Sequence, residues 1–182
     1  MAQDIIEALR HDHQELRKMF ARLEAATGKR RRDLFQRLVA ELVRHEVAEE
    51  EILRPVSKRD AGKAIANARI KEESRAEELL KDMEKLDPGS AEFTAKLARL
   101  RRDVERHAEA EETKEFPRVA KKETTERLAQ MGRTYEVAKK AAPTRPHPST
   151  PNTPAANMVA GPFAAVLDRT RDAVRDVLKS AS

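Results

Sequence analysis

Cysteine and tryptophan are both absent from this chain of 182 residues, and only 3% of its residues are aromatic. Without cysteine the protein can form no disulfide, hold no metal through a thiolate and use no cysteine nucleophile. Any metal ion must therefore be held by histidine, aspartate, glutamate or tyrosine. The scarcity of aromatic residues disfavours β-sheet, and a charged fraction of 38% is typical of long solvated helices.

Long apolar stretches are also lacking. The N-terminal stretch MAQDIIEALRHDH carries charge throughout and has no apolar core like that of a signal peptide. No apolar run approaches the roughly 18 residues that a membrane span needs. These absences predict a soluble cytoplasmic protein with no membrane partner.

The excess of positive charge is small and dispersed. The formal net charge is +5, and the one basic run, at 29–32, follows Gly28, where we expect a loop between helices. No aromatic side chains accompany this run to stack on bases, so the pattern argues against a nucleic-acid partner. A metal-free bundle that binds nucleic acid through this loop ranks well below the other interpretations.

Four segments repeat apolar residues at the three- and four-residue spacing of helices that pack in a bundle. These segments span residues 6–23, 35–56, about 60–86 and 93–111. Pro55 and Pro117 disfavour helical geometry in the residue before them and so predict helix ends. Because the loops are short, consecutive helices should be antiparallel. The predicted fold class is all-α: an antiparallel up-down four-helix bundle with a C-terminal proline-rich arm and additional helices.

The domain organisation follows from this pattern. We expect the four-helix bundle at 1–120, an additional helix at 121–142, an extended arm at 143–162 and an amphipathic helix at 163–182. The arm holds six of the nine prolines. An arm followed by an apolar-faced helix suggests docking, either onto its own bundle or onto a neighbouring subunit in a homodimer.

Two stretches of the chain share the pattern R-H-x-x-A-E-E-x-x-x-x-P. They are RHEVAEEEILRP at 44–55 and RHAEAEETKEFP at 106–117. In each, a histidine precedes a glutamate by four residues, which puts the two side chains on one face of a helix. Two such helices that face each other bring two imidazoles and two carboxylates into one layer of the core.

The residues in question are His45, Glu49, His107 and Glu111, and each lies on a seam that is otherwise apolar. His13 lies on the seam of the first helix. A buried carboxylate needs a cation or several hydrogen bonds to offset its desolvation. A lone seam histidine is more often an ordinary core residue, but three histidines and two glutamates in one layer predict a metal site of the kind found in dinuclear iron or manganese bundles.

This arrangement resembles the hemerythrin-like HHE cation-binding domain family over roughly residues 1–120. The resemblance rests on IIEALRHDHQELRKMF at 5–20, the two H-x-x-x-E motifs and KEESRAEELLKDMEKL at 71–86. It implies a four-helix bundle with two iron ions joined by an oxo or hydroxo bridge, with manganese as an alternative metal. The metal ligands on this interpretation are His13, His45, Glu49, Glu73, His107 and Glu111.

The third helix departs from the family pattern. The family usually has Glu-His here, whereas this chain has Glu72-Glu73, and Arg69 replaces the additional histidine of oxygen-carrying hemerythrins. Glu73 is predicted to be a ligand, with a position outside the ligand sphere or a salt bridge to Arg69 as alternatives. An added carboxylate favours the higher oxidation state of a bound metal, which argues against simple O₂ transport.

Further candidates are expected around the ligands rather than among them. They are Glu46, Glu72, Arg69, Tyr135 and His147. Tyr135, the only tyrosine, is interpreted as packing, with contact to the metals as the alternative. His147 lies between two prolines and is interpreted as a linker residue, with a cap over the site as the alternative. His11 is expected at the surface.

The predicted function is reaction with O₂, H₂O₂ or a related small oxidant, in oxidative-stress defence or sensing. Peroxidase-like, catalase-like and oxidase activities remain open, and no catalytic residue is predicted beyond the metal ligands. The alternative is a non-enzymatic iron- or oxygen-binding sensor or storage module that signals through the C-terminal arm.

Overall fold

The computed structural model describes residues 3–141 and 162–180, and every regular element in these two ranges is helical. The arm predicted at 143–162, apart from its last residue, and His147 lie outside the described residues. The elements are α1 (Ile5–Glu24), α2 (Gly28–Ile52), α3 (Arg54–Asp60), α4 (Lys63–Met83), α5 (Ala91–Ala110), the π-helix η1 (Glu111–Glu115), α6 (Phe116–Lys122), α7 (Thr125–Ala141) and α8 (Pro162–Ser180).

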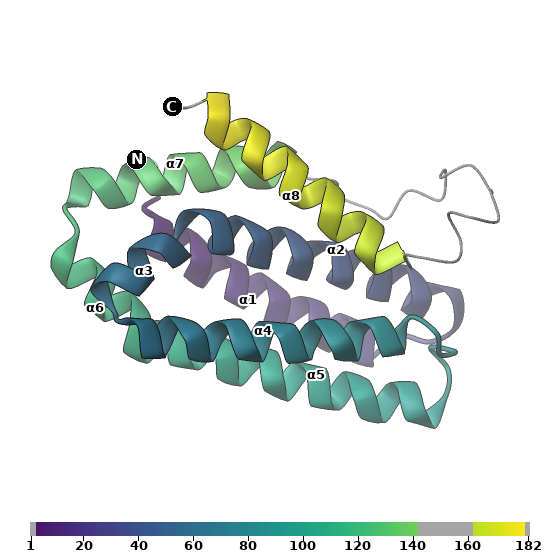
Figure 1. Cartoon of the computed structure of the whole chain (residues 1–182). Helices are drawn as coiled ribbons and strands as arrows, with labels where there is room; N and C mark the ends of the chain where they lie inside the picture. The colour runs from purple at the N-terminus through teal and green to yellow at the C-terminus, as the bar shows by residue number, and fades with distance from the viewer. Residues whose placement is uncertain (1–2, 142–161, 181–182) are drawn as a thin grey trace.

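Helices α1, α2, α4 and α5 lie side by side as a four-helix bundle (Figure 1), which confirms the predicted fold class. The helices α7 and α8 cover the α1–α2 side of this bundle, with α7 against α1 and α8 against α2. Val174 of α8 is fully buried there. The C-terminal helix therefore packs on its own chain, and the homodimer stays a prediction.

Local sequence explains where two of the bundle helices begin. Asp4 caps α1 by accepting a hydrogen bond from the Glu7 amide at 2.8 Å, and Glu7 reaches back to the Asp4 amide. The Ser90 hydroxyl caps α5 in the same way through the amide of Phe93. Such caps satisfy backbone groups that the first helical turn leaves unpaired.

The basic run predicted to lie in a loop is instead the first turn of α2, so this expectation was wrong. Gly28 adopts a φ of 55°, a left-handed conformation that glycine tolerates without strain. The chain therefore reverses at Gly28, and the helix begins before the run rather than after it. Arg31 is not free in solvent, because its guanidinium donates to the Thr94 hydroxyl at 3.1 Å.

The two prolines mark changes of helix rather than the end of helical chain. Pro55 lies in the first turn of α3, and Pro117 lies in the first turn of α6. Between α5 and α6 the five residues of η1 form a π-helix, in which the Phe116 amide donates to the carbonyl of Glu111. A π-helical turn has one residue more than an α-helical turn, because its hydrogen bonds join residues five apart. Phe116 therefore lies one turn after Glu111 on the same, inner side of the bundle, where it is fully buried. Such turns are frequent at functional sites.

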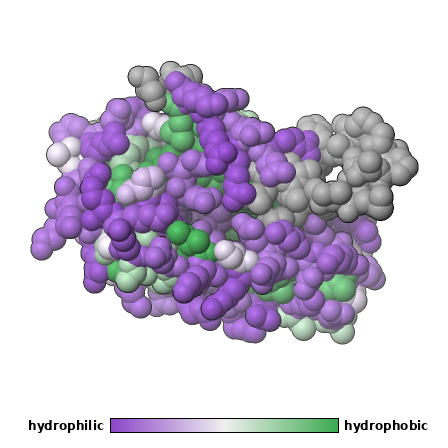
Figure 2. Space-filling view, in the orientation of Figure 1, coloured by the Kyte–Doolittle hydropathy of each residue, from purple (hydrophilic) through white to green (hydrophobic). Residues whose placement is uncertain are grey.

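The face in Figure 2 is largely hydrophilic, with apolar residues visible only in small separate areas. Within 3–141 and 162–180, none of the helices combines the length and apolar character required to cross a membrane.

Gly132 permits an unusually close approach between α7 and the start of α1. A Cβ atom at this position would lie 2.8 Å from the backbone carbon of Asp4 and 2.9 Å from the backbone nitrogen of Ile5, and it would also collide with the carbonyl oxygen of Gln3. These neighbours are backbone atoms, which cannot move aside as a flexible side chain can. The absence of a side chain therefore fixes the distance between α7 and α1.

We expect Gly132→Ala to destabilise the protein by about 1–3 kcal/mol, because the overpacking outweighs the gain in helix propensity, which is about 1 kcal/mol. Chemical denaturation would measure this change. Gly89→Ala is the control, since its Cβ would meet only the Asp87 side chain, at 3.3 Å or more. Equal stabilities for the two variants would contradict the close backbone approach.

Candidate metal centre

Three buried histidines from three helices meet at one level of the bundle. His13 comes from α1, His45 from α2 and His107 from α5, and none is more than 6% exposed. Each has its Nδ1 atom held by a neighbouring side chain. The partners are Glu112 Oε1 at 2.8 Å from His13, Tyr135 Oη at 3.0 Å from His45 and Glu72 Oε2 at 3.0 Å from His107. Partners at Nδ1 fix the ring orientation of metal-binding histidines in this way.

The Nε2 atoms of the same rings face two fully buried carboxylates. His13 Nε2 lies 3.4 Å from Glu111 Oε2, and His45 Nε2 lies 3.6 Å from Glu49 Oε2. His107 Nε2 lies 3.0 Å from Glu111 Oε1. The two glutamates therefore stand between the imidazoles.

The ligand-type atoms form three overlapping groups in which all atoms lie within 4.8 Å of one another. The groups are His13–His45–Glu111, Glu49–His107–Glu111 and Glu46–Glu73–His107. The structure thus brings together all six residues predicted as ligands. It adds Glu46, which was predicted to lie beside them.

The unpaired atoms at this level fit a divalent cation. The Nε2 atoms of His13 and His107 and the Oε2 atoms of Glu49 and Glu111 are buried and make no hydrogen bond. A buried polar atom without a partner costs about 1–3 kcal/mol. Imidazole nitrogen and carboxylate oxygen are ligands that iron, manganese and zinc accept. A metal ion between these atoms would satisfy them together.

The electrostatics of the two buried glutamates differ. Burial raises the pKa of Glu49 well above its usual value, and the charge of Glu111 adds to this effect. Burial would also raise the pKa of Glu111, but the positive charge of the neighbouring His107 holds it well below the usual value. These opposite pKa shifts favour an ionised Glu111 beside a protonated Glu49, unless a further positive charge enters the layer.

Sequence reasoning missed a cation that this layer already contains, Arg54 of α3. Its side chain is buried, with Nη2 at 2.8 Å from Glu49 Oε1 and 2.5 Å from Glu73 Oε1. Nη1 lies 2.9 Å from Oε1 of Glu115, a second buried residue that was missed. Burial would lower the pKa of Arg54, but the surrounding carboxylates raise it above its ordinary value, so the guanidinium stays charged.

The residue before Pro55 was interpreted only as a helix end, which is why Arg54 escaped notice. A signal was nevertheless available. When the two repeated stretches are aligned, Leu53-Arg54-Pro55 corresponds to Glu115-Phe116-Pro117. In the first stretch the charged Arg54 stands where the second has the apolar Phe116. In the second stretch the charged Glu115 stands where the first has the apolar Leu53.

Helix α4 supplies side chains that pair with other residues of this layer. Arg69 forms an ion pair with Glu72 at 3.0 Å, and Glu72 in turn holds His107. The alternative of an Arg69–Glu73 salt bridge is not what the structure contains, since Glu73 binds Arg54 instead. Glu46 points its buried Oε2 toward this region without a hydrogen-bond partner, and burial raises its pKa to about 8.

Tyr135 connects α7 to the centre through a residue that was not predicted, Asp12. Its hydroxyl donates to Asp12 Oδ2 at 2.6 Å, and Lys139 donates to the same oxygen at 2.6 Å. Tyr135 is fully buried, so it packs in the core as well as contacting His45. Asp12 neighbours His13 in sequence, but its role depends on α7, whose position no local pattern reveals.

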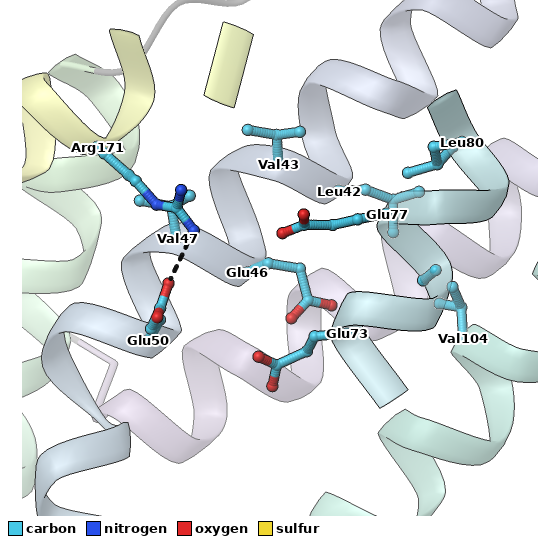
Figure 3. A pocket seen from close by; sticks show the side chains of 11 residues that line it. Leu42, Val43, Glu46, Val47, Glu50, Glu73, Glu77, Leu80, Val104 and Arg171 are labelled. Carbon is cyan, nitrogen blue, oxygen red and sulfur yellow. Dashed lines mark ion pairs between the residues drawn. The ribbon is translucent and has the colours of Figure 1, made fainter. Parts of the chain in front are cut away.

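A pocket of about 40 Å³ adjoins the centre between α2 and α4. The carboxyl groups of Glu46 and Glu73 lie close together on its wall (Figure 3). Apolar residues such as Val43 and Leu80 line most of the rest, and Glu77 also lines the pocket. Arg171 of α8 reaches this pocket and pairs with Glu50 at 3.5 Å. The pocket therefore gives small molecules access to Glu73, which also contacts Arg54.

The fold and this constellation define a helical-bundle protein with a candidate cation centre of histidine and glutamate. The model of the hemerythrin HHE cation binding domain matches residues 4–119. The chain is 30% identical, over 92% of its length and 85% of the relative, to an uncharacterized hemerythrin-like protein of Schizosaccharomyces pombe. It therefore belongs to the hemerythrin HHE cation-binding domain family.

A crystal structure from the same family has a similar fold. It is that of a hemerythrin HHE cation binding domain-containing protein from Mycobacterium kansasii, with a TM-score of 0.69 and 18% identity. The match covers 76% of this chain and 86% of that one. At this identity the likeness supports the fold alone.

We expect Tyr135→Phe to weaken metal binding by about 10–100-fold, because it removes the hydroxyl that orients His45. Titration of the metal-free protein with Mn²⁺ would measure the affinity. Thr134→Val is the matched control, since it also removes a hydroxyl from α7, but one that bonds only to the carbonyl of Gln130. If both variants bind Mn²⁺ like the wild type, Tyr135 does not position a ligand.

Proposed function

We propose that this protein is a non-haem iron protein whose centre reacts with O₂, H₂O₂ or a related small oxidant, in oxidative-stress defence or sensing. The observation that supports it best is the orientation of the three histidines. Each Nδ1 is held from outside, and each Nε2 faces a buried carboxylate. A purely structural layer would have no need to leave buried donor and acceptor atoms unpaired.

In this proposal His13 and His45 hold one ion, and His107 and Glu73 hold a second. Glu49 and Glu111 would supply buried carboxylate oxygens to the same centre. Iron in these positions would supply the one-electron steps by which small oxidants are reduced. The protein holds the imidazoles in place, keeps bulk water out of the layer and admits small molecules through the pocket beside Glu73.

The carboxylate of Glu73 favours oxidant reduction over reversible O₂ transport. Relative to an imidazole, it adds negative charge and a harder ligand, and both stabilise the higher oxidation state of iron or manganese. The apolar walls of the pocket suit a small, weakly polar substrate. Its volume of about 40 Å³ exceeds the roughly 10–15 Å³ that one water molecule needs.

A sensing function is a second candidate, supported by the contact between α8 and the pocket. Arg171 lines the pocket, and Arg175 one turn later pairs with Glu51 of α2 at 3.1 Å. A change of charge at the centre would thus alter the electrostatic interactions that hold α8, which lies outside the bundle. Repeated consumption of H₂O₂ by the iron-loaded protein would favour the enzyme, whereas a single stoichiometric oxidation would favour the sensor.

We expect His45→Ala and His107→Ala each to lose most of the iron bound by the wild type, because each removes one inward nitrogen. Elemental analysis of protein expressed with added iron would measure this loss. His11→Ala is the control, since His11 is exposed on the outer face of α1. A wild-type protein without iron or manganese, or His45→Ala and His107→Ala variants with undiminished metal content, would refute the proposed function.

A further inference from the structure

The two oxygens of each buried carboxylate, Glu49 and Glu111, have different surroundings. Glu49 Oε2 and Glu111 Oε2 face His45 and His13, and neither oxygen makes a hydrogen bond. Glu49 Oε1 and Glu111 Oε1 instead face Arg54, with Nη2 at 2.8 and 3.5 Å. The side toward His13 and His45 is therefore open to a cation, and the other side already has one.

Arg54 also forms an ion pair with Glu73, the carboxylate proposed to hold the second ion together with His107. Glu73 Oε1 lies 2.5 Å from Arg54 Nη2 and 3.9 Å from His107 Nε2. Three carboxylate oxygens thus converge on one guanidinium nitrogen, and they are oxygens that an ion beside His107 would need. Arg54 and that ion cannot hold them at the same time.

The two repeated stretches place different residues against the two sides of the centre, Phe116 against His13 and Arg54 against Glu49. Phe116 follows Glu111 by five residues, and its ring stacks on His13, with centroids 6.0 Å apart and planes inclined by 11°. Arg54 follows Glu49 by five residues and is anchored from below by Glu115 at 2.9 Å. One side of the centre is therefore closed by an apolar ring and the other by a buried ion pair.

We propose that Arg54 is a resident cation in the place of the second metal ion, so that the centre takes one ion readily and a second only when the guanidinium is displaced. This inference rests on the proposed function, and it concerns how the same site is loaded. The first ion binds at His13 and His45 with the free oxygens of Glu49 and Glu111. The second ion must break the contacts of Arg54 with Glu49, Glu73 and Glu111.

The buried position of Arg54 sets the size of this effect. Breaking a buried ion pair is strongly destabilising, because the charge left behind has neither water nor a partner. A displaced Arg54 would retain only Glu115 among its present carboxylate partners, and it would also lie close to two divalent cations. We therefore expect the second ion to bind roughly 100-fold or more weakly than the first.

The test is a titration of the full-length metal-free chain with Mn²⁺. Calorimetry measures the number and affinity of the bound ions, and electron paramagnetic resonance shows whether they are isolated or coupled. The wild type should bind one ion tightly and give the six-line spectrum of an isolated Mn²⁺. Arg54→Met should bind two ions with affinities within about tenfold of each other, and their spectrum should be that of a coupled pair. Arg59→Met is the control, because Arg59 lies on the same helix with an exposed side chain.

A second variant covers the case in which Arg54→Met fails to fold with Glu115 unpaired. The double change Arg54→Phe with Glu115→Leu removes both charges and gives both repeated stretches the same Leu-Phe-Pro sequence. It should also bind two ions. Without metal, both variants should melt at lower temperature than the wild type, since the carboxylates lose their cation, and Mn²⁺ should raise their melting temperature more than that of the wild type.

The outcomes separate this inference from the proposed function. Two ions of similar affinity in the wild type, or only one ion in both Arg54 variants, would overturn the role of Arg54 while leaving the metal centre intact. A wild type that binds no Mn²⁺ and no iron would overturn the proposed function and this inference together.

Discussion

The structure depends on compensating two carboxylates, Glu49 and Glu111, that are fully buried in the core of a helical bundle. Several kcal/mol oppose the burial of each charge unless positive charge or hydrogen bonds surround it. The bundle helices provide three imidazoles at this level, and α3 provides one guanidinium. The surrounding core is apolar, so the electrostatic interactions within the layer are little screened by solvent.

Three features outside the regular bundle helices place side chains around this layer. The π-helix η1 carries Glu111 and Glu115 and brings Phe116 beneath His13. The break between α2 and α3 likewise brings Arg54 beneath Glu49. Helix α7 is held against α1 at Gly132 and delivers Tyr135 to His45. Each of these features thus brings a side chain into contact with the histidines or glutamates of the layer.

Much of this centre could be predicted from the sequence, because the i, i+4 spacing of histidine and glutamate is a local property of a helix. The seams fixed which faces meet, and they placed His13, His45 and His107 in one layer. Arg54 and Glu115 could not be recognised in the same way. Arginine before a proline is an ordinary helix end, and its burial follows only from the path that the chain takes into α3.

Asp12 and Tyr135 illustrate the same limit over a longer distance. They are 123 residues apart and meet only because α7 folds back over α1. Likewise, the sequence offered Arg69 only as an alternative partner for Glu73, and in the structure Glu73 pairs with Arg54 instead.

The sequence by itself determined the bundle and the inward-facing histidines and glutamates, since helical periodicity sets which residues share a face. Only the tertiary structure decided which charges compensate which. Ion pairs form between side chains that are close in space. In this protein the cation that pairs with the buried glutamates is Arg54, which lies on the short helix α3, and no periodic sequence pattern predicts that helix.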